Sequence, residues 1–227
     1  FAQMSGGKGN DTYYLDYALG GQVIEYANEG IDTVYGTWGG SYTLPANVEI
    51  YKDLGTGANR ITESPDELIG NTLDNRIEVV YGSSLRYYID GGAGADTMIG
   101  GNSGDVYVID NTGDRVVETS SQLAGSPKLQ DEIRTSVTYE LVDNVENLTL
   151  TGSAAIEGWG NTLANRIDAA SNTESNTVYG GLGDDYFVVD ANDTIVEKSG
   201  EGIDTAELHG TGTRLYTTAD LPANVEN

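Results

Sequence analysis

The chain contains no cysteine, one histidine, four prolines and no long apolar run. The absence of cysteine excludes a disulfide framework, a thiolate nucleophile and a cysteine-based zinc site. The single histidine, His209, has no serine motif near it, which argues against a catalytic triad and a histidine-based zinc site. No segment approaches the roughly 18 apolar residues that cross a bilayer, and residues 1–25 lack the basic, apolar and small-residue pattern of an export signal. We therefore expect no membrane span.

Positive charge is also scarce, since 11 Lys and Arg residues stand against 36 Asp and Glu residues, a net charge of −25. A nucleic-acid binder needs the opposite balance, so that class is excluded. What the chain has instead is glycine, 31 of 227 residues, and 15 tyrosines. Glycine at this frequency argues against helices, because each interior glycine costs a helix up to about 1 kcal/mol. The composition predicts short strands, tight turns and a ligand that neutralises the acidic side chains.

A long repeat dominates the sequence. Segments 6–16, 100–110 and 180–190 align as GGKGNDTYYLD, GGNSGDVYVID and GGLGDDYFVVD. The step from Asp105 to Asp185 equals the step from Asn144 to Asn224, and the first copy is longer. We predict two repeat units and a truncated third in one continuous solenoid array, with boundaries at 1–90, 91–179 and 180–227.

A shorter period of nine residues runs inside the long unit. Residues 82–117 divide into GSSLRYYID, GGAGADTMI, GGNSGDVYV and IDNTGDRVV, and position eight is apolar in all four: Ile89, Met98, Tyr107 and Val116. A step of nine residues is too short for a helical hairpin but fits one turn and one three-residue strand. Stacked steps of this kind form a solenoid in which each rung covers its neighbours. The predicted fold class is all-β, a parallel β-roll or β-solenoid with Gly/Asp turns.

The glycine-rich turns carry ligand chemistry for calcium. Glycine supplies positive φ, and the aspartate at position six adds a carboxylate to the turn. Calcium takes six to eight hard oxygen ligands, so one turn cannot complete a site but two turns on the same edge can. Same-edge turns are expected two nine-residue steps apart, which is the separation of Asp96 and Asp114 and makes that pair the first choice. The pairs Asp185 with Asp204 and Asp11 with Asp32 are slightly farther apart in sequence and would need small bulges.

The complete set of candidate calcium ligands comprises the turn glycines and their acids. The set is Gly6, Gly7, Gly9, Asp11, Asp32, Gly91, Gly92, Gly94, Asp96, Gly100, Asp105, Asp114, Asp131, Gly180, Gly181, Gly183, Asp185 and Asp204. Because Asp and Gly also form ordinary turns, a single copy would not require a metal. Because these turns recur in register with an apolar position eight, the sequence favours a bound metal.

Two groups of polar residues fit other or additional roles. Asparagine occupies position six in several rungs (Asn59, Asn75, Asn165 and Asn176), where an amide can close the turn without a metal. Those rungs are predicted to be calcium-free spacers. Acids also follow the strands, at Asp16, Asp110 and Asp190 and at Glu25, Glu118 and Glu197. These acids could either complete the coordination of calcium or be solvated turn residues, and the sequence leaves both interpretations open.

The nonapeptides resemble the repeats of RTX proteins, whose GGxGxDxUx consensus forms a calcium-binding parallel β-roll. The long unit, with DTYYLD, EGIDTV, LPANVE and GNTLDNRI, is similar to repeats of large secreted RTX adhesins and surface proteins. GGNSGD lacks the glycine at position four and GSSLRYYID lacks the aspartate, so a few discrete ions are expected. The resemblance implies type I secretion, an extracellular, cell-surface location and folding outside the cell when calcium binds.

The predicted function is a non-enzymatic, calcium-dependent structural segment of an adhesin, surface layer, filament or matrix protein. One alternative is the calcium-dependent folding module of a secreted lipase, protease or alginate epimerase. Another is a carbohydrate-binding module that uses aromatic side chains, with Tyr13, Tyr35, Trp38, Tyr42, Tyr51 and Trp159 as the candidates. Uncapped solenoid rungs also predict self-association into arrays or filaments.

Overall fold

The computed structural model describes residues 2–15, 21–36, 41–54, 65–80, 85–118, 130–209 and 225–226. These residues form 22 short strands and no helix, so the all-β prediction is confirmed for them. Within that described part, no helix exists that could cross a membrane. The chain divides into two compact units, Phe1–Leu129 and Gln130–Asn227. Trp38, Asn59 and Asp16 lie outside the described residues.

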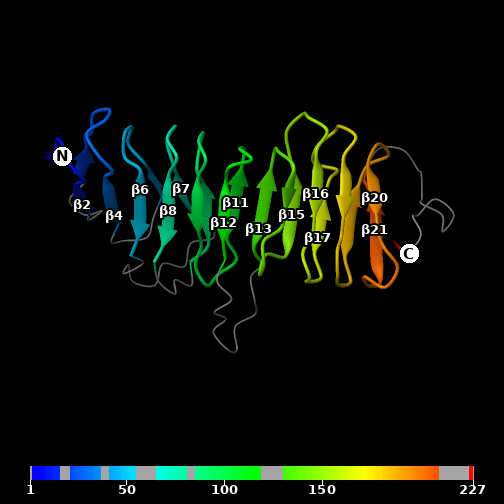
Figure 1. Ribbon diagram of the computed structural model, residues 1–227. Helices are drawn as coiled ribbons and strands as arrows, with labels where there is room; N and C mark the ends of the chain where they lie inside the picture. Colours follow the sequence, from blue (N-terminus) through cyan, green and yellow to red (C-terminus); the bar gives the residue numbers. More distant parts are fainter. Residues whose placement is uncertain are drawn as a thin grey trace. The chain divides into compact units, whose positions relative to one another are not determined.

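Unit 1 contains twelve of the described strands, arranged in parallel sheets (Figure 1). A two-stranded sheet pairs β1 (Ala2–Met4) with β3 (Gly21–Val23). A six-stranded sheet has the order β2 (Thr12–Leu15), β4 (Thr33–Gly36), β6 (Ile50–Asp53), β8 (Arg76–Val79), β10 (Thr97–Ile99) and β12 (Arg115–Val117). A further sheet has the order β5 (Tyr42–Thr43), β7 (Asp66–Ile69), β9 (Tyr87–Asp90) and β11 (Val106–Ile109).

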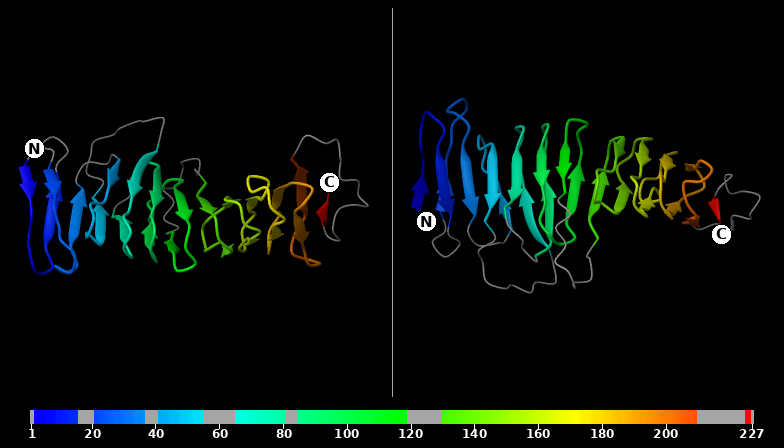
Figure 2. Two further views of the ribbon diagram at one scale, coloured as in Figure 1. Left: turned by 90° about the horizontal axis from the view of Figure 1, so that it is seen from above. Right: turned by 60° about the horizontal axis from the view of Figure 1, so that its bottom comes forward.

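Unit 2 repeats this construction with ten strands. One sheet has the order β13 (Glu132–Thr135), β15 (Asn147–Leu150), β17 (Arg166–Asp168), β19 (Tyr186–Val189), β21 (Asp204–Leu208) and β22 (Val225–Glu226). The other has the order β14 (Tyr139–Glu140), β16 (Glu157–Trp159), β18 (Thr177–Tyr179) and β20 (Thr194–Val196). Within each unit, the further views in Figure 2 show strands of successive turns side by side.

The strand register establishes the solenoid. Among the described residues, neighbouring strands pair in parallel, and in the two-sheet regions each strand pairs with the next but one along the chain. Met98 pairs with Val116, two nine-residue steps later, and with Ile77 on the preceding turn. Two such steps therefore complete one turn, with one strand on each of two sheets. This confirms the parallel β-solenoid in each unit.

The core follows the predicted position eight. Ile89, Met98 and Tyr107 are fully buried, and Val116 is 5 % exposed. In unit 2 Phe187 is fully buried and pairs with Ile167 on one neighbouring turn and with Ala206 on the other. Apolar side chains thus stack in columns between the two sheets. Because a parallel ladder repeats every ~4.8 Å, each column excludes water without a large core.

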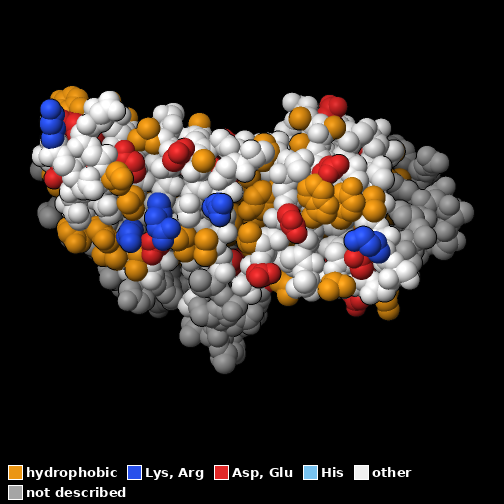
Figure 3. Space-filling model, in the orientation of Figure 1, with side chains coloured by type: hydrophobic (Ala, Val, Ile, Leu, Met, Phe, Trp, Pro, Cys, Tyr) orange, Lys and Arg blue, Asp and Glu red, His pale blue; other side chains and the backbone are white. Residues whose placement is uncertain are grey.

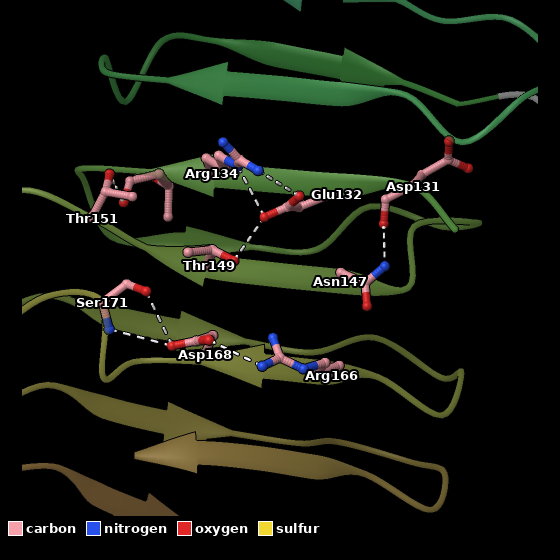
Figure 4. Close-up of polar contacts among 10 residues, drawn as sticks. Asp131, Glu132, Arg134, Asn147, Thr149, Thr151, Arg166, Asp168 and Ser171 are labelled. Carbon is pink, nitrogen blue, oxygen red and sulfur yellow. Dashed lines mark hydrogen bonds and ion pairs between the residues drawn. The ribbon is translucent and has the colours of Figure 1, made fainter. Parts of the chain in front are cut away.

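The outer face of the β13–β15–β17 sheet is polar. Figure 4 shows Arg134 paired with Glu132, and Arg166 paired with Asp168, across this face. Burial alone would raise the pKa of Glu132, but hydrogen bonds from Arg134 and Thr149 outweigh it and hold that pKa below its ordinary value. Half-exposed pairs of this kind contribute at most about 1 kcal/mol each. They keep the sheet face solvated.

Candidate metal centres

The aspartates at position six form ladders along the edges of the turns. Each carboxylate accepts a hydrogen bond from the backbone N–H of the corresponding residue one turn earlier. Asp32 Oδ1 accepts from Asp11 N at 2.8 Å. Asp114 Oδ1 accepts from Asp96 N at 2.9 Å, and Asp204 Oδ1 accepts from Asp185 N at 3.0 Å. The structure therefore brings together all three pairs that the spacing selects.

A glutamate completes two of these pairs as groups of three carboxylates. Glu25 joins Asp11 and Asp32 in unit 1, and Glu197 joins Asp185 and Asp204 in unit 2. In each triad, one carboxylate oxygen of every member lies within 4.8 Å of the others. Among the described residues, no third acid joins Asp96 and Asp114 in such a group. The first-choice pair is thus adjacent as expected, but the two pairs with longer separations gather more ligands.

The triads hold carboxylate oxygens that are buried and have no hydrogen-bond partner among the described residues. Asp32 is 1 % exposed and Asp185 is 2 % exposed, and the Oδ2 atom of each has no partner. The same holds for Asp11 Oδ2 and Glu25 Oε2. A buried, unpaired carboxylate is costly unless a proton or cation neutralises it. The donor set, which consists only of oxygen, matches a hard divalent cation.

The electrostatics of the unit 2 triad also indicate that its carboxylates need a proton or a cation to neutralise them. Burial, with the neighbouring charge of Asp204, raises the pKa of Asp185 from 3.8 to about 6. Burial also raises the pKa of Glu197 from 4.5 to about 7, although the hydrogen bond from Gly180 opposes the shift. In unit 1 burial raises the pKa of Glu25. A bound cation would favour the ionised form of each group instead.

The carboxylate oxygens of Asp96 and Asp114 differ in how many of them accept hydrogen bonds. Asp114 Oδ2 accepts hydrogen bonds from the backbone N–H groups of Asp110 and Asn111, so both of its oxygens have partners. Asp96 Oδ1 accepts a hydrogen bond from Asn75 N, whereas no described residue donates to its Oδ2. Burial raises the pKa of Asp96 to about 6. This pair offers one unpartnered carboxylate oxygen and lacks the glutamate that completes either triad.

The glycines of the motif make room for the acids. A Cβ at Gly6, Gly91 or Gly180 would collide with the carboxylate of Asp11, Asp96 or Asp185, respectively. The second and fourth positions have positive φ: Gly7 (81°), Gly9 (126°), Gly92 (79°), Gly94 (141°), Gly181 (92°) and Gly183 (122°). The first glycine therefore provides space, and the other two provide backbone conformation. At Gly100 a Cβ would meet Tyr107, Glu118 and Asp105.

The remaining predicted ligands, Asp105 and Asp131, are buried as well. In unit 1 Asp105 Oδ1 accepts from Tyr87 N and its Oδ2 accepts from Gly101 N, both at 2.8 Å. In unit 2 the backbone N–H of Asp131 donates to Glu146 Oε2 at 3.0 Å. The role of each as a ligand stays a prediction.

The asparagine rungs are closed by amides. Asn75 Oδ1 accepts from Asn71 N, while its Nδ2 donates to the carbonyls of Val48 and Glu49 on the preceding turn. Asn165 repeats this pattern in unit 2. An amide thus finds partners on both sides at a position where a carboxylate retains an unpartnered oxygen. This supports the prediction that these rungs are metal-free spacers.

The acids that follow the strands, whose role the sequence leaves open, divide into two kinds. Glu25 and Glu197 are buried members of the triads, whereas Asp110 is exposed and Asp190 Oδ1 accepts a hydrogen bond from Asn192 N. The signal that separates them is position along the chain. The two glutamates follow the next strand after the motif, on the other sheet, whereas the two aspartates directly follow the strand of the motif itself.

Tyr13, which the sequence suggests only as an aromatic candidate for sugar binding, positions one of the glutamates. The Tyr13 hydroxyl donates to Glu25 Oε1 and accepts from Gly6 N at 2.6 Å. The hydroxyl of Tyr107 donates to Glu118 in the same way. The corresponding residue of unit 2 is Phe187, which has no hydroxyl, and there Gly180 N donates directly to Glu197 Oε1 at 2.6 Å.

Replacing Tyr13 with phenylalanine is expected to weaken the unit 1 triad. The loss of a hydrogen bond to a carboxylate, about 1.5 kcal/mol, corresponds to a calcium affinity roughly tenfold lower. Isothermal titration of calcium would measure the change. Tyr14→Phe is the matched control, because Tyr14 is on the same strand, is 65 % exposed and has a hydroxyl without a hydrogen bond to any described residue. Equal affinities in the two variants would contradict the positioning role of Tyr13.

Acidification is expected to stabilise the protein when calcium is absent. The folded-state pKa values of Asp185 (about 6) and Glu197 (about 7) lie above their ordinary values, so the folded state binds protons more tightly than the unfolded chain does. The contribution of these two groups to the free energy of unfolding is fully present near pH 4 and is lost as the pH rises through 6 and 7. Urea unfolding of metal-stripped protein between pH 4.5 and 7.5 would measure it. With saturating calcium the trend should reverse, because protons compete for the same oxygens.

Comparison with known proteins gives a limited similarity. No protein-family model matches the chain, and no solved structure matches it. The chain is 44% identical over 66 residues to the endo-1,3-1,4-beta-glycanase ExsH of Rhizobium meliloti (strain 1021). The match covers 29% of this chain and 14% of that protein. The similarity is therefore confined to a segment of both chains.

Proposed function

We propose that this chain is a calcium-dependent, non-catalytic structural segment of a large secreted protein of the adhesin, surface-layer, filament or matrix kind. The observation that carries the proposal is the pair of buried carboxylate triads, in which Asp32 Oδ2 and Asp185 Oδ2 have no hydrogen-bond partner in the part of the chain that the structure describes. A parallel solenoid that folds around such groups needs a cation to complete it. The RTX-like repeats point to the same role.

Calcium is the cation that fits the ligands and the charge. Neither triad contains histidine or cysteine, so each offers only the hard oxygen ligands that calcium prefers. Magnesium demands a tighter octahedron and gives up water reluctantly, so it should bind less well. Two calcium ions would change the net charge from −25 to −21. The reduced repulsion favours the compact state.

The expected affinity supports folding outside the cell. Extracellular calcium modules bind with dissociation constants of roughly 10⁻⁴ to 10⁻³ M. Such sites are empty in a calcium-poor cytosol and filled outside. Because the triads assemble residues from successive turns, they do not exist in the unfolded chain. The free energy of calcium binding therefore contributes directly to folding.

A second candidate function is the calcium-dependent module of a secreted enzyme. The partial similarity to a protein named as a glycanase favours this candidate. In that arrangement this segment would still bind calcium and would still lack a catalytic role. Measuring hydrolysis of β-glucan by the isolated chain would test the non-catalytic assignment, and turnover would contradict it.

A calcium titration tests the proposed function. We expect a cooperative gain of β-structure in far-UV circular dichroism, with a parallel change in tyrosine and tryptophan fluorescence, at submillimolar to millimolar calcium. A chelator should reverse the change, and magnesium should produce little of it. A chain that is equally folded and equally stable without calcium would overturn the proposal.

A further inference from the structure

Unit 2 has a groove that belongs to neither triad. It has a volume of about 450 Å³ and is lined along the ends of β14, β16, β18 and β20. The lining residues that carry the argument are Glu140, Asp143, Trp159, Tyr179, Val196 and Lys198. In Figure 3, hydrophobic side chains gather over this part of unit 2, with acidic side chains beside them. The groove thus combines flat apolar surface with charge.

Two aromatic side chains that line the groove are stacked on each other. Trp159 and Tyr179 pair across β16 and β18, and their rings stack at 5.1 Å with an angle of 11°. Trp159 therefore covers one face of Tyr179. The other face points toward β20, where Tyr179 pairs with Val196. The valine side chain is smaller than the phenol ring, and both Tyr179 and Val196 line the groove.

Polar groups that have no hydrogen-bond partner among the described residues line the groove with that ring. Within the described residues, the Trp159 indole N–H and the Tyr179 hydroxyl make no hydrogen bond, although both side chains are only partly exposed. The carboxylates of Glu140 and Asp143 likewise have no hydrogen-bond partner in the part of the chain that is described. A ligand rich in hydroxyl groups could satisfy all four. Sugar rings add apolar C–H faces that pack on aromatic rings.

The charge of the groove selects among ligands. Three carboxylates line it, from Glu140, Asp143 and Glu201, against the single amine of Lys198. Lys198 pairs with Glu201 at 3.4 Å, so two carboxylates stay uncompensated. An anionic polysaccharide would be repelled, both here and by a chain of net charge −25. A neutral polysaccharide keeps the hydrogen bonds to the carboxylates without the repulsion.

We propose that this groove binds a neutral polysaccharide, with one sugar ring against the face of Tyr179 that is turned away from Trp159. Hydroxyl groups of that sugar and its neighbours bond to the Trp159 N–H, the Tyr179 hydroxyl and the acids Glu140 and Asp143. The site is separate from the metal triads, and its ligand contacts come from side chains other than theirs. It gives the segment a glycan-binding surface in addition to its structural role.

Binding by the full chain in saturating calcium tests the inference. Isothermal titration and affinity electrophoresis would use soluble mixed-linkage β-glucan and xyloglucan as neutral probes, polygalacturonate as the anionic probe and polylysine as the basic peptide probe. We expect binding of at least one neutral probe and none of polygalacturonate. Tyr179→Ala should lower the affinity at least about tenfold, since the ring face and one hydroxyl are lost together.

Two further variants keep the test decisive. Tyr14→Ala breaks the comparable stack of Tyr14 on Tyr35 in unit 1, 5.0 Å apart, and should leave the affinity unchanged. Trp159→Phe retains an aromatic ring but removes the indole N–H, and it should weaken binding several-fold even if Tyr179→Ala fails to fold. Absence of binding to both neutral probes would overturn the inference, as would equal loss in the Tyr14 and Tyr179 variants. So would polylysine binding that Tyr179→Ala abolishes. Circular dichroism in calcium separates these outcomes from failure of calcium-dependent folding.

Discussion

Replacing Asp185 with asparagine is expected to stabilise the calcium-free protein and to abolish the calcium response of the unit 2 triad. The variant keeps an oxygen to accept the hydrogen bond from Asn165 N and exchanges the unpartnered Oδ2 for an amide. Asn165 shows where that amide would donate, namely to carbonyls of the preceding turn. Removing a buried, unpaired charge in this way should add about 1–3 kcal/mol to the free energy of unfolding.

The same substitution removes a ligand that calcium needs. At about 10 mM calcium, a site with a dissociation constant of 10⁻⁴ to 10⁻³ M adds roughly 1.4–2.7 kcal/mol to stability, and the variant should lose this increment. Chemical unfolding with calcium and with chelator measures both effects. Asp184→Asn is the matched control, because it removes the same charge one residue away, where the exposed Asp184 accepts from Ile203 N. A variant at Asp185 that is destabilised in chelator would contradict the unpaired-carboxylate account.

Replacing Gly180 with alanine is expected to disable the same triad by a different route. The φ of Gly180 is not in the left-handed region, so alanine meets no backbone strain there. Its Cβ would instead occupy the space of the Asp185 and Glu197 carboxylates. Both are ends of flexible side chains and can move aside. We therefore expect a small change in calcium-free stability but a loss of calcium affinity of at least about tenfold.

Replacing Gly200 with alanine separates the effect of a Cβ collision from the effect of backbone strain. Gly200 has a φ of 88°, and nothing lies within 4 Å of the position that its Cβ would take. Alanine there should cost about 1 kcal/mol through backbone strain in both calcium and chelator, with calcium affinity unchanged. Calcium titration of the two variants distinguishes the mechanisms. If Gly180→Ala bound calcium as tightly as Gly200→Ala, the triad would not be the binding site.

Asparagine and aspartate at position six give the rungs different chemistry within one backbone geometry. Asn75 and Asn165 satisfy both ends of the amide with backbone groups of their own and the preceding turn. Asp32 and Asp185 offer one oxygen to the preceding turn and keep the other unpartnered. Since the two residue types differ by one polar group and one charge, the sequence can distribute metal sites along a solenoid without altering its turns.

The sequence by itself determined the fold class and the residues of the turns. The nine-residue period with an apolar position eight predicts a parallel solenoid, and the buried column through Ile77, Met98 and Val116 confirms it. This succeeded because a repeat places equivalent residues in equivalent environments, so periodicity alone specifies which side chains stack. The spacing of Asp96 and Asp114 likewise predicted that the two would be neighbours.

Only the tertiary structure determined which acidic side chains come together in the triads. Glu25 and Glu197 follow the strand after the motif strand, on the other sheet, whereas the exposed Asp110 directly follows a motif strand. The meaning of this difference in position appears only once the turns are stacked. Tyr13 and Phe187 occupy equivalent positions, yet only the tyrosine has a hydroxyl to hold a glutamate. The physical reason is that a metal site depends on distances of a few ångströms across neighbouring turns. Periodicity fixes the order of those turns, whereas side-chain reach and burial fix the distances.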